Sequence, residues 1–178
     1  MQAPPDRVEE AATLSALLAL DILDTEPEIE FDALVRAASI ICDAPISLIT
    51  LIDADRQWFK ANVGLPSVSE TPRNLSFCAY AVLEDGLFEV NDASSDARFQ
   101  DNPLVTGEPD IKFYAGAPLP LRGGRRIGTL CVFDRKPRKL TTRQRESLLL
   151  LSKAATQALE GRAALQKQTE TSRLNARA

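Results

Sequence analysis

The amino-acid sequence predicts one α+β domain, with helices towards both ends of the chain and hairpin-connected strands between them. A chain of 178 residues is long enough to bury one hydrophobic core. Apolar residues recur at helical spacing near both ends, whereas the middle holds short apolar runs separated by turn residues. We expect residues 8–165 to form this domain and residues 1–7 to be a disordered tail. Residues 166–178 are expected to be a fraying helical tail or the start of a linker to an output module that this sequence lacks.

Two helices are expected before the first strand. Leucines at helical spacing give residues 8–20 one apolar face, which predicts an amphipathic helix. Thr25 and Glu28 have the spacing of a capping box, and Pro27 suits a first turn because its missing N–H would have no partner there. The second helix is therefore expected to begin after Thr25 and to run to about Cys42.

The middle of the chain predicts strands. Residues 46–52 are apolar at nearly every position, which is typical of a central strand covered on both faces. Turn residues follow, so the next strand is its expected hairpin partner, and Gly123 and Gly124 mark a second hairpin. Pro118 lacks the N–H that a sheet ladder uses, and it predicts a bulge or an unpaired position. The other expected strands span residues 57–63, 87–90, 113–119 and 126–134.

Loops and shorter helices connect these strands. Residues 64–74 are expected to form a loop, and Ser76 is the expected cap of a short helix. The stretch 91–110 is too long for a plain connector, so we expect it to be ordered and to form the wall of a pocket. Thr141 and Gln144 have the spacing of a capping box for the last helix.

Composition and charge exclude several classes of protein. The net charge of −4 and the pI near 5.0 argue against a nucleic-acid surface. No apolar stretch of the sequence approaches the ~20 residues of a membrane span, and the N-terminus lacks the charge and the apolar run of a signal peptide. We therefore expect a cytoplasmic protein with neither nucleic-acid nor membrane partners.

The sequence contains no histidine, and its three cysteines are Cys42, Cys78 and Cys131. Zinc sites, haem ligands, phosphoacceptor sites and catalytic triads commonly use histidine. An odd number of widely spaced cysteines forms neither a disulfide framework nor a zinc pattern. We therefore expect neither haem nor zinc as a cofactor and no metal site, and the identity of any other cofactor stays open.

The most informative signal is a series of seven segments, which are Pro45–Asp53, Asp55–Lys60, Pro72–Tyr80, Asp96–Phe99, Asp101–Val105, Phe113–Leu119 and Ile127–Asp134. In this order they resemble GAF domains, the small-molecule and redox sensing modules of bacterial sensor histidine kinases and diguanylate cyclases. The resemblance covers about residues 17–160. It implies a central antiparallel sheet of about six strands, with N- and C-terminal helices on one face and a ligand chamber on the other. It also implies a sensor in signal transduction, of the kind found in two-component systems.

The resemblance points to residues that would surround this chamber. Cys78 follows the expected cap Ser76, where helix-end amides can lower the pKa of a thiol, although cysteine in a short apolar helix is also a common core residue. Thr129 and Cys131 share one face of their strand by alternation. The candidate ligand-binding residues are Arg73, Phe77, Cys78, Asp92, Phe99, Asn102, Phe113, Tyr114, Thr129 and Cys131.

The same resemblance bears on cofactors and catalysis. Bilin-binding GAF domains attach their chromophore through a cysteine that is followed by histidine, whereas Ala79 follows Cys78 here, so a bilin is not expected. A free methionine sulfoxide reductase within the family uses a set of cysteines that Cys42, Cys78 and Cys131 do not reproduce. We expect no catalytic residues and a protein that is not an enzyme. The alternative function from a different class is a thiol redox enzyme, namely a cysteine-based methionine sulfoxide reductase.

The last helix carries a heptad-like seam, which includes Leu151, Ala155, Ala158 and Leu165. In multidomain sensors this helix pairs with its mate in a dimer and continues into an output module. We therefore expect a homodimer through the terminal helices, an unidentified small-molecule ligand, and a downstream signalling protein or output domain. A second hypothesis is that bulky side chains fill the chamber, which would leave a dimerisation or protein-interaction module.

Overall fold

The centre of the sheet is built from strands that are apolar on both faces. In the computed structural model, which describes residues 2–177, β1 (Ile46–Ile52) is buried at every position and lies between β2 (Arg56–Val63) and β6 (Arg126–Asp134). All pairs are antiparallel, and the strand order is β3-β2-β1-β6-β5-β4. The six-stranded sheet with helices confirms the expected α+β fold. The remaining strands are β3 (Glu70–Pro72), β4 (Phe88–Val90) and β5 (Phe113–Pro120).

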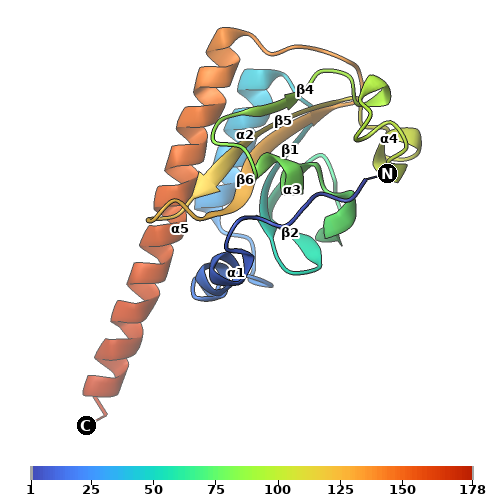
Figure 1. The fold of residues 1–178 in the computed structure, drawn as a ribbon. Helices are drawn as coiled ribbons and strands as arrows, with labels where there is room; N and C mark the ends of the chain where they lie inside the picture. The colour runs from blue at the N-terminus through green and yellow to red at the C-terminus, as the bar shows by residue number, and fades with distance from the viewer. Residues whose placement is uncertain (1, 178) are drawn as a thin grey trace.

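Helices cover the two faces of this sheet differently (Figure 1). On one face, called the helix face here, α2 (Ile29–Cys42) and α5 (Thr142–Asn175) pack together, and α1 (Glu10–Leu18) joins their apolar cluster. On the other, called the chamber face, lie the short helices α3 (Phe77–Ala81) and α4 (Pro103–Thr106). Both faces are therefore covered, as the uniformly buried β1 requires.

The helix face holds a continuous apolar core. Ile49 and Leu51 of β1 and Leu130 of β6 point into it, and Phe31 and Leu148 meet them from α2 and α5. Full burial of such a side chain contributes about 1.5–3 kcal/mol relative to its exposure. This core fixes the two long helices on the sheet.

Local capping signals located two helix starts. The Ser76 Oγ atom accepts a hydrogen bond from the Ala79 N–H at 3.0 Å, so Ser76 caps α3 as expected. Thr141 and Gln144 form the reciprocal capping box that begins α5. These signals are reliable because they involve residues within one helical turn.

The capping box expected for the second helix is wrong. Helix α2 begins later, with Glu28 at its N-cap, and no side chain within residues 2–177 caps it. The Glu28 carboxylate instead pairs with Lys60 Nζ at 2.6 Å and with Arg162 Nε at 2.8 Å. Because the Lys60 side chain is fully buried, its charge needs this partner more than the helix end needs a cap.

The connecting segments contain more structure than the sequence indicated. Residues 64–74, expected to be a loop, include β3 and the 3-10 turn η1 (Arg73–Leu75). The stretch 91–110 is ordered as expected and contains η2 (Ala93–Ser95) and α4. The bulge expected at Pro118 is confirmed, because the register of β5 against β6 shifts between Pro118 and Pro120.

Residues 2–7, for which a disordered tail was expected, run along α3 (Figure 1). The Tyr80 hydroxyl of α3 donates a hydrogen bond to the Gln2 carbonyl at 2.7 Å. Buried Arg7 donates to the carbonyls of Ile52 and Arg126, at 3.0 and 2.9 Å. These contacts fix the segment against the chamber face, and Met1 lies outside the described residues.

Helix α5 extends beyond the body of the domain (Figure 1). Its residues 148–159 pack on the sheet, whereas residues 164–175 are helical and exposed throughout. A fraying tail or linker was expected from residue 166 onwards. Of the predicted seam, Ala155 is buried in the core, Leu151 and Ala158 are half-buried, and Leu165 is 65% exposed. Within the described chain no helix has the length and apolar character needed to cross a membrane.

Candidate functional site

The centre of the chamber face is filled by aromatic rings. Phe77 of α3 stacks on Phe99 of the 91–110 stretch, with ring centroids 4.2 Å apart. Tyr114 of β5 lies 4.9 Å from Phe133 of β6 and 5.4 Å from Phe77. Such packing holds α3 and the long connector against the sheet. The 91–110 stretch therefore forms a wall over this face.

A cluster of buried polar side chains, called the thiol cluster here, adjoins these rings and shares Tyr114 with them. It consists of Cys78, Cys131, Tyr114, Thr50 and Thr129, all of which are fully buried. The sulfur atoms of Cys78 and Cys131 are 3.7 Å apart, and the Tyr114 hydroxyl donates to Cys78 Sγ at 3.2 Å. Cys131 Sγ lies 3.6 Å from the carbonyl oxygen of Leu48, and the two threonine hydroxyls are 3.0 Å apart. Each polar group therefore has a partner within the cluster or the adjacent strand.

The two thiols have opposite pKa shifts. Burial raises the pKa of Cys78, but hydrogen bonds from the surrounding side chains outweigh burial and lower its pKa below the usual value. Burial and the adjacent Cys78 sulfur raise the pKa of Cys131 well above its usual value. Burial likewise raises the pKa of Tyr114, so its hydroxyl stays protonated and can donate. Cys78 is therefore the thiol that loses its proton more readily.

An apolar pocket of about 320 Å³ opens beside this cluster on the chamber face. Its floor includes Leu48 and Phe133, and Leu104 and Ile111 form part of its wall. Its polar groups are few, and one of them, Gln57, is buried. An apolar cavity of this size with a few oriented polar groups suits a small organic molecule. The full lining is Leu48, Gln57, Phe59, Leu65, Val68, Thr71, Leu104, Glu108, Pro109, Ile111 and Phe133.

The orientation of Gln57 is fixed by two neighbours. Its Nε2 atom donates to Thr71 Oγ1 at 3.0 Å, and its Oε1 atom accepts from Ser76 Oγ at 2.5 Å. Ser76 is also the cap of α3. Gln57 therefore joins the pocket to the helix that carries Cys78.

The structure brings six of the ten candidate ligand residues together around the thiol cluster, and none of the ten lines the pocket. These six are Phe77, Cys78, Phe99, Tyr114, Thr129 and Cys131. The pocket lining was missed because alternation shows that Gln57 and Phe59 share a face, but not which face of the sheet it is. The chamber is thus partly filled by side chains and partly open.

The other four candidates support the structure around the site. Asn102 accepts from the Leu104 N–H and donates to the Leu75 carbonyl, which fixes α4 against η1. Asp92 caps η2 through Ser94. These side chains act as turn and cap residues.

Arg73 and Phe113 lie apart from the pocket. Arg73 donates to the Asp53 carbonyl at 2.9 Å and forms an ion pair with Glu10. Phe113 belongs to the helix-face core, on the opposite side of the sheet from Tyr114, and Arg138 lies over its ring. Successive strand residues point to opposite faces, so these two neighbours could not both face the chamber.

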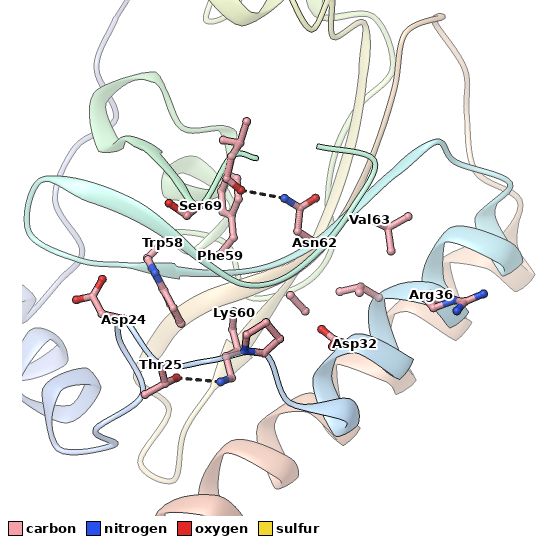
Figure 2. Close-up of a pocket in the computed structure, with 14 residues that line it drawn as sticks. Asp24, Thr25, Asp32, Arg36, Trp58, Phe59, Lys60, Asn62, Val63 and Ser69 are labelled. Atoms are coloured by element: carbon pink, nitrogen blue, oxygen red, sulfur yellow. Dashed lines mark hydrogen bonds between the residues drawn. The ribbon is translucent and has the colours of Figure 1, made fainter. Parts of the chain in front are cut away.

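A larger groove of about 740 Å³ lies at the outer edge of the sheet, between β2 and α2 (Figure 2). Figure 2 shows Asp32 and Arg36 on the α2 side and Asn62 on the β2 side. Lys60 donates to Thr25 Oγ1 at 2.9 Å, and Asn62 Nδ2 donates to the Val68 carbonyl at 3.0 Å. These polar contacts join the walls of the groove to each other, so they contribute to the fold. Within residues 2–177 no group of three or more histidine, cysteine, aspartate or glutamate side chains is placed to hold a metal ion.

Comparison with known proteins agrees with this architecture. The family model described as GAF domain matches residues 26–159. The GAF domain of an Acinetobacter phosphoenolpyruvate-protein phosphotransferase has the same fold, with a TM-score of 0.64 and 18% identity over 88% of this chain and 95% of that one. A domain assigned to a two-component sensor histidine kinase from Sinorhizobium meliloti has a TM-score of 0.58 and 17% identity, over 83% and 99% of the two chains.

A curated relative is more similar in sequence. Cyclic di-GMP phosphodiesterase PA2567 from Pseudomonas aeruginosa is 46% identical over 138 residues, which are 78% of this chain and 23% of that protein. The chain thus spans less than a quarter of the relative's length. This finding corrects the expectation that the protein is not an enzyme, because the region that it shares occurs in a protein named as one.

Proposed function

This chain belongs to the GAF domain family and is a regulatory sensory domain, and we propose that it binds a small, mainly apolar molecule in the chamber-face pocket. The pocket itself carries this proposal: it has about 320 Å³ of space, largely apolar walls and an oriented amide at Gln57. Binding in such a cavity removes apolar surface from water, and the amide would orient the ligand.

Native mass spectrometry of the gently purified protein tests the proposal. We expect an extra mass that is lost on denaturation. As a direct probe, 1-anilinonaphthalene-8-sulfonate should bind and gain fluorescence, because its aromatic rings suit the apolar lining. Leu65→Trp would fill the pocket and should abolish both signals, whereas Leu150→Trp, on the exposed side of α5, should leave them unchanged. Equal probe binding by the two variants would refute the pocket as the site.

Strand β2 connects the pocket to α5. Phe59 of β2 lines the pocket, and the next residue, Lys60, points to the helix face, where its ammonium lies over the Phe31 ring. There Glu28 pairs with Lys60 and with Arg162 of α5, so one carboxylate joins the strand to the helix. We propose that ligand binding shifts this contact and changes how the exposed part of α5 pairs in a homodimer or joins an output module. A ligand can do this only if its affinity differs between the two arrangements.

We further propose that the regulated activity is cyclic di-GMP turnover. The support is the 46% identity to a region of the protein named Cyclic di-GMP phosphodiesterase PA2567. This chain can replace the matching region of that relative, and phosphodiesterase activity can then be measured for the chimera with and without Leu65→Trp. We expect the pocket-filling change to alter the activity of the chimera. Identical rates for the two chimeras, in the presence of the native ligand, would contradict the regulatory link.

A further inference from the structure

The thiol cluster is more than a filled part of the core, because it brings two cysteines into contact from distant parts of the chain. Cys78 lies on α3 and Cys131 on the central strand β6, 53 positions apart, with their sulfur atoms at 3.7 Å. A disulfide needs about 2.05 Å between the sulfur atoms. Closing the remaining distance requires only a small shift of one element towards the other.

We propose that Cys78 and Cys131 form a reversible disulfide bond across the chamber face when the protein meets a peroxide. The two sulfur atoms have different surroundings, which suits the two roles in this reaction. Cys78 Sγ accepts a hydrogen bond from the Tyr114 hydroxyl, which stabilises its thiolate, whereas Cys131 Sγ lies within donor distance of the Leu48 carbonyl. Cys78 is therefore the attacking sulfur and Cys131 the resolving one.

The chemistry has two steps. In the first, the Cys78 sulfur attacks one peroxide oxygen, the O–O bond breaks, a sulfenic acid forms, and the departing oxygen leaves as water with the thiol proton. In the second, the Cys131 sulfur attacks Cys78 Sγ, the S–S bond forms, the S–O bond breaks, and the hydroxyl leaves as water with the Cys131 proton. For hydrogen peroxide, two thiols lose two electrons and one peroxide gains them, giving one disulfide and two waters.

Neither cysteine lines the pocket, but the pocket borders the surroundings of this pair, so a small peroxide that enters the pocket would come close to it. Leu48 and Phe133 form part of the pocket floor. The Leu48 carbonyl is the oxygen next to Cys131 Sγ, and Phe133 lies two positions further along the same strand. Cys42 has no such neighbourhood, since it belongs to the helix-face core.

Bond formation would move α3 in preference to β6. Strand β6 is paired on both sides, with β1 and with β5, whereas α3 is a five-residue helix. The cap of α3, Ser76, bonds to Gln57 of the pocket, and Tyr80 of α3 bonds to Gln2. Oxidation would therefore change both the pocket and the hydrogen bond that fixes the N-terminal segment to α3. This effect on the pocket rests on the proposed function, whereas the disulfide bond itself does not.

Thiol counting on the full chain tests the bond. The reduced protein is exposed to hydrogen peroxide, denatured, alkylated and weighed, and non-reducing digestion identifies linked peptides. We expect three alkylated cysteines before oxidation and one, Cys42, afterwards, with a Cys78–Cys131 peptide that a dithiol reductant removes. Three labelled cysteines after exposure, a bond that involves Cys42, or a sulfinic acid at Cys78 beside a reduced Cys131 would overturn the proposal.

Two variants sharpen this test. Cys42→Ala should form the same linked peptide as the unaltered chain, whereas Cys131→Ala should accumulate sulfenic and sulfinic acid at Cys78 because the resolving thiol is missing. Probe binding by the reduced and the oxidised chain separates the two proposals. If the chain binds the fluorescent probe but forms no Cys78–Cys131 disulfide, only this inference is refuted. If the disulfide forms but the chain binds no probe, only the proposed function is refuted.

Discussion

The helix face and the chamber face of the sheet are built from neighbouring residues of the same strands, but they differ in how their buried polar side chains are paired. On the helix face the core is largely apolar, and two of its buried hydroxyl oxygens, Ser47 Oγ and Thr156 Oγ1, have no hydrogen-bond partner within residues 2–177. On the chamber face Thr50 and Thr129 bond to each other. A buried polar atom without a partner reduces stability, whereas buried polar groups that bond to one another, as in the thiol cluster, are less costly and can form a site. The contrast fits our proposal that the chamber face binds the ligand while the helix face holds the domain together.

The largest effect is expected from a cavity in the helix face. Leu130→Ala should lower the free energy of unfolding by about 3–4 kcal/mol, because a fully buried leucine is removed from a tightly packed core. Leu48→Ala, on the chamber face, should lower it by about 2–3 kcal/mol, since Leu48 already borders an open pocket. Chemical denaturation of both variants measures this difference. Equal losses of unfolding free energy in the two variants would show that the two faces do not differ in packing.

The next largest effect is expected at Glu28. Glu28→Gln leaves the buried Lys60 charge without its carboxylate and should lower the free energy of unfolding by about 2–3 kcal/mol at neutral pH. Denaturant unfolding measures the loss. Glu30→Gln, at an exposed position of the same helix, is the control and should change stability by less than about 0.5 kcal/mol.

The effect of Glu28→Gln should depend on pH. Burial raises the pKa of Glu28, but hydrogen bonds from Lys60 and Arg162 outweigh it and lower its pKa below the usual 4.5. A carboxylate with a lowered folded-state pKa stabilises the protein above its unfolded pKa and loses that contribution as pH falls through the folded value. The stability gap between wild type and variant should therefore shrink as the pH falls below about 4. A gap that stays constant would show that the ion pairs do not stabilise the fold.

A smaller effect, of opposite sign on the two faces, is expected from removing hydroxyls. Thr129→Val should cost about 1–2 kcal/mol because it leaves the buried Thr50 hydroxyl without its partner, and the double change Thr50→Val/Thr129→Val should be nearly neutral. Thr156→Val on the helix face should instead stabilise by about 0.5–1 kcal/mol, since this hydroxyl has no partner within the described residues. Thermal unfolding of the wild type and of these three variants measures the changes in stability. Stabilisation by Thr129→Val alone would contradict a linked polar cluster.

The smallest effect on stability is expected at the exposed end of α5, which belongs to neither face. Leu165→Gln should change the free energy of unfolding by less than about 0.5 kcal/mol, because this side chain is 65% exposed. It should nevertheless weaken a homodimer that uses this part of the helix, as light scattering during size-exclusion chromatography would show. Ala155→Gln, a change at a buried seam position, should destabilise the domain instead.

Local patterns in the sequence determined much of the fold. The apolar run of β1, the two hairpins, the Ser76 cap and the Thr141–Gln144 capping box were predictable, because each depends on residues within a few positions of one another. The bulge at Pro118 followed from its missing N–H. The resemblance to GAF domains added the sheet of six strands and the placement of the chamber.

Tertiary structure alone decided which residues make the site. Glu28 left its expected capping role because a buried Lys60, 32 positions away, pairs with it, and Arg73 pairs with Glu10. Phe113 and Tyr114 were both expected at the chamber, yet the pleat sends one to each face. The contact between Cys78 and Cys131 and the shape of the pocket depend on how α3 and the long connector pack on the sheet. Such distances arise from the packing of segments far apart in the chain, which no local spacing encodes.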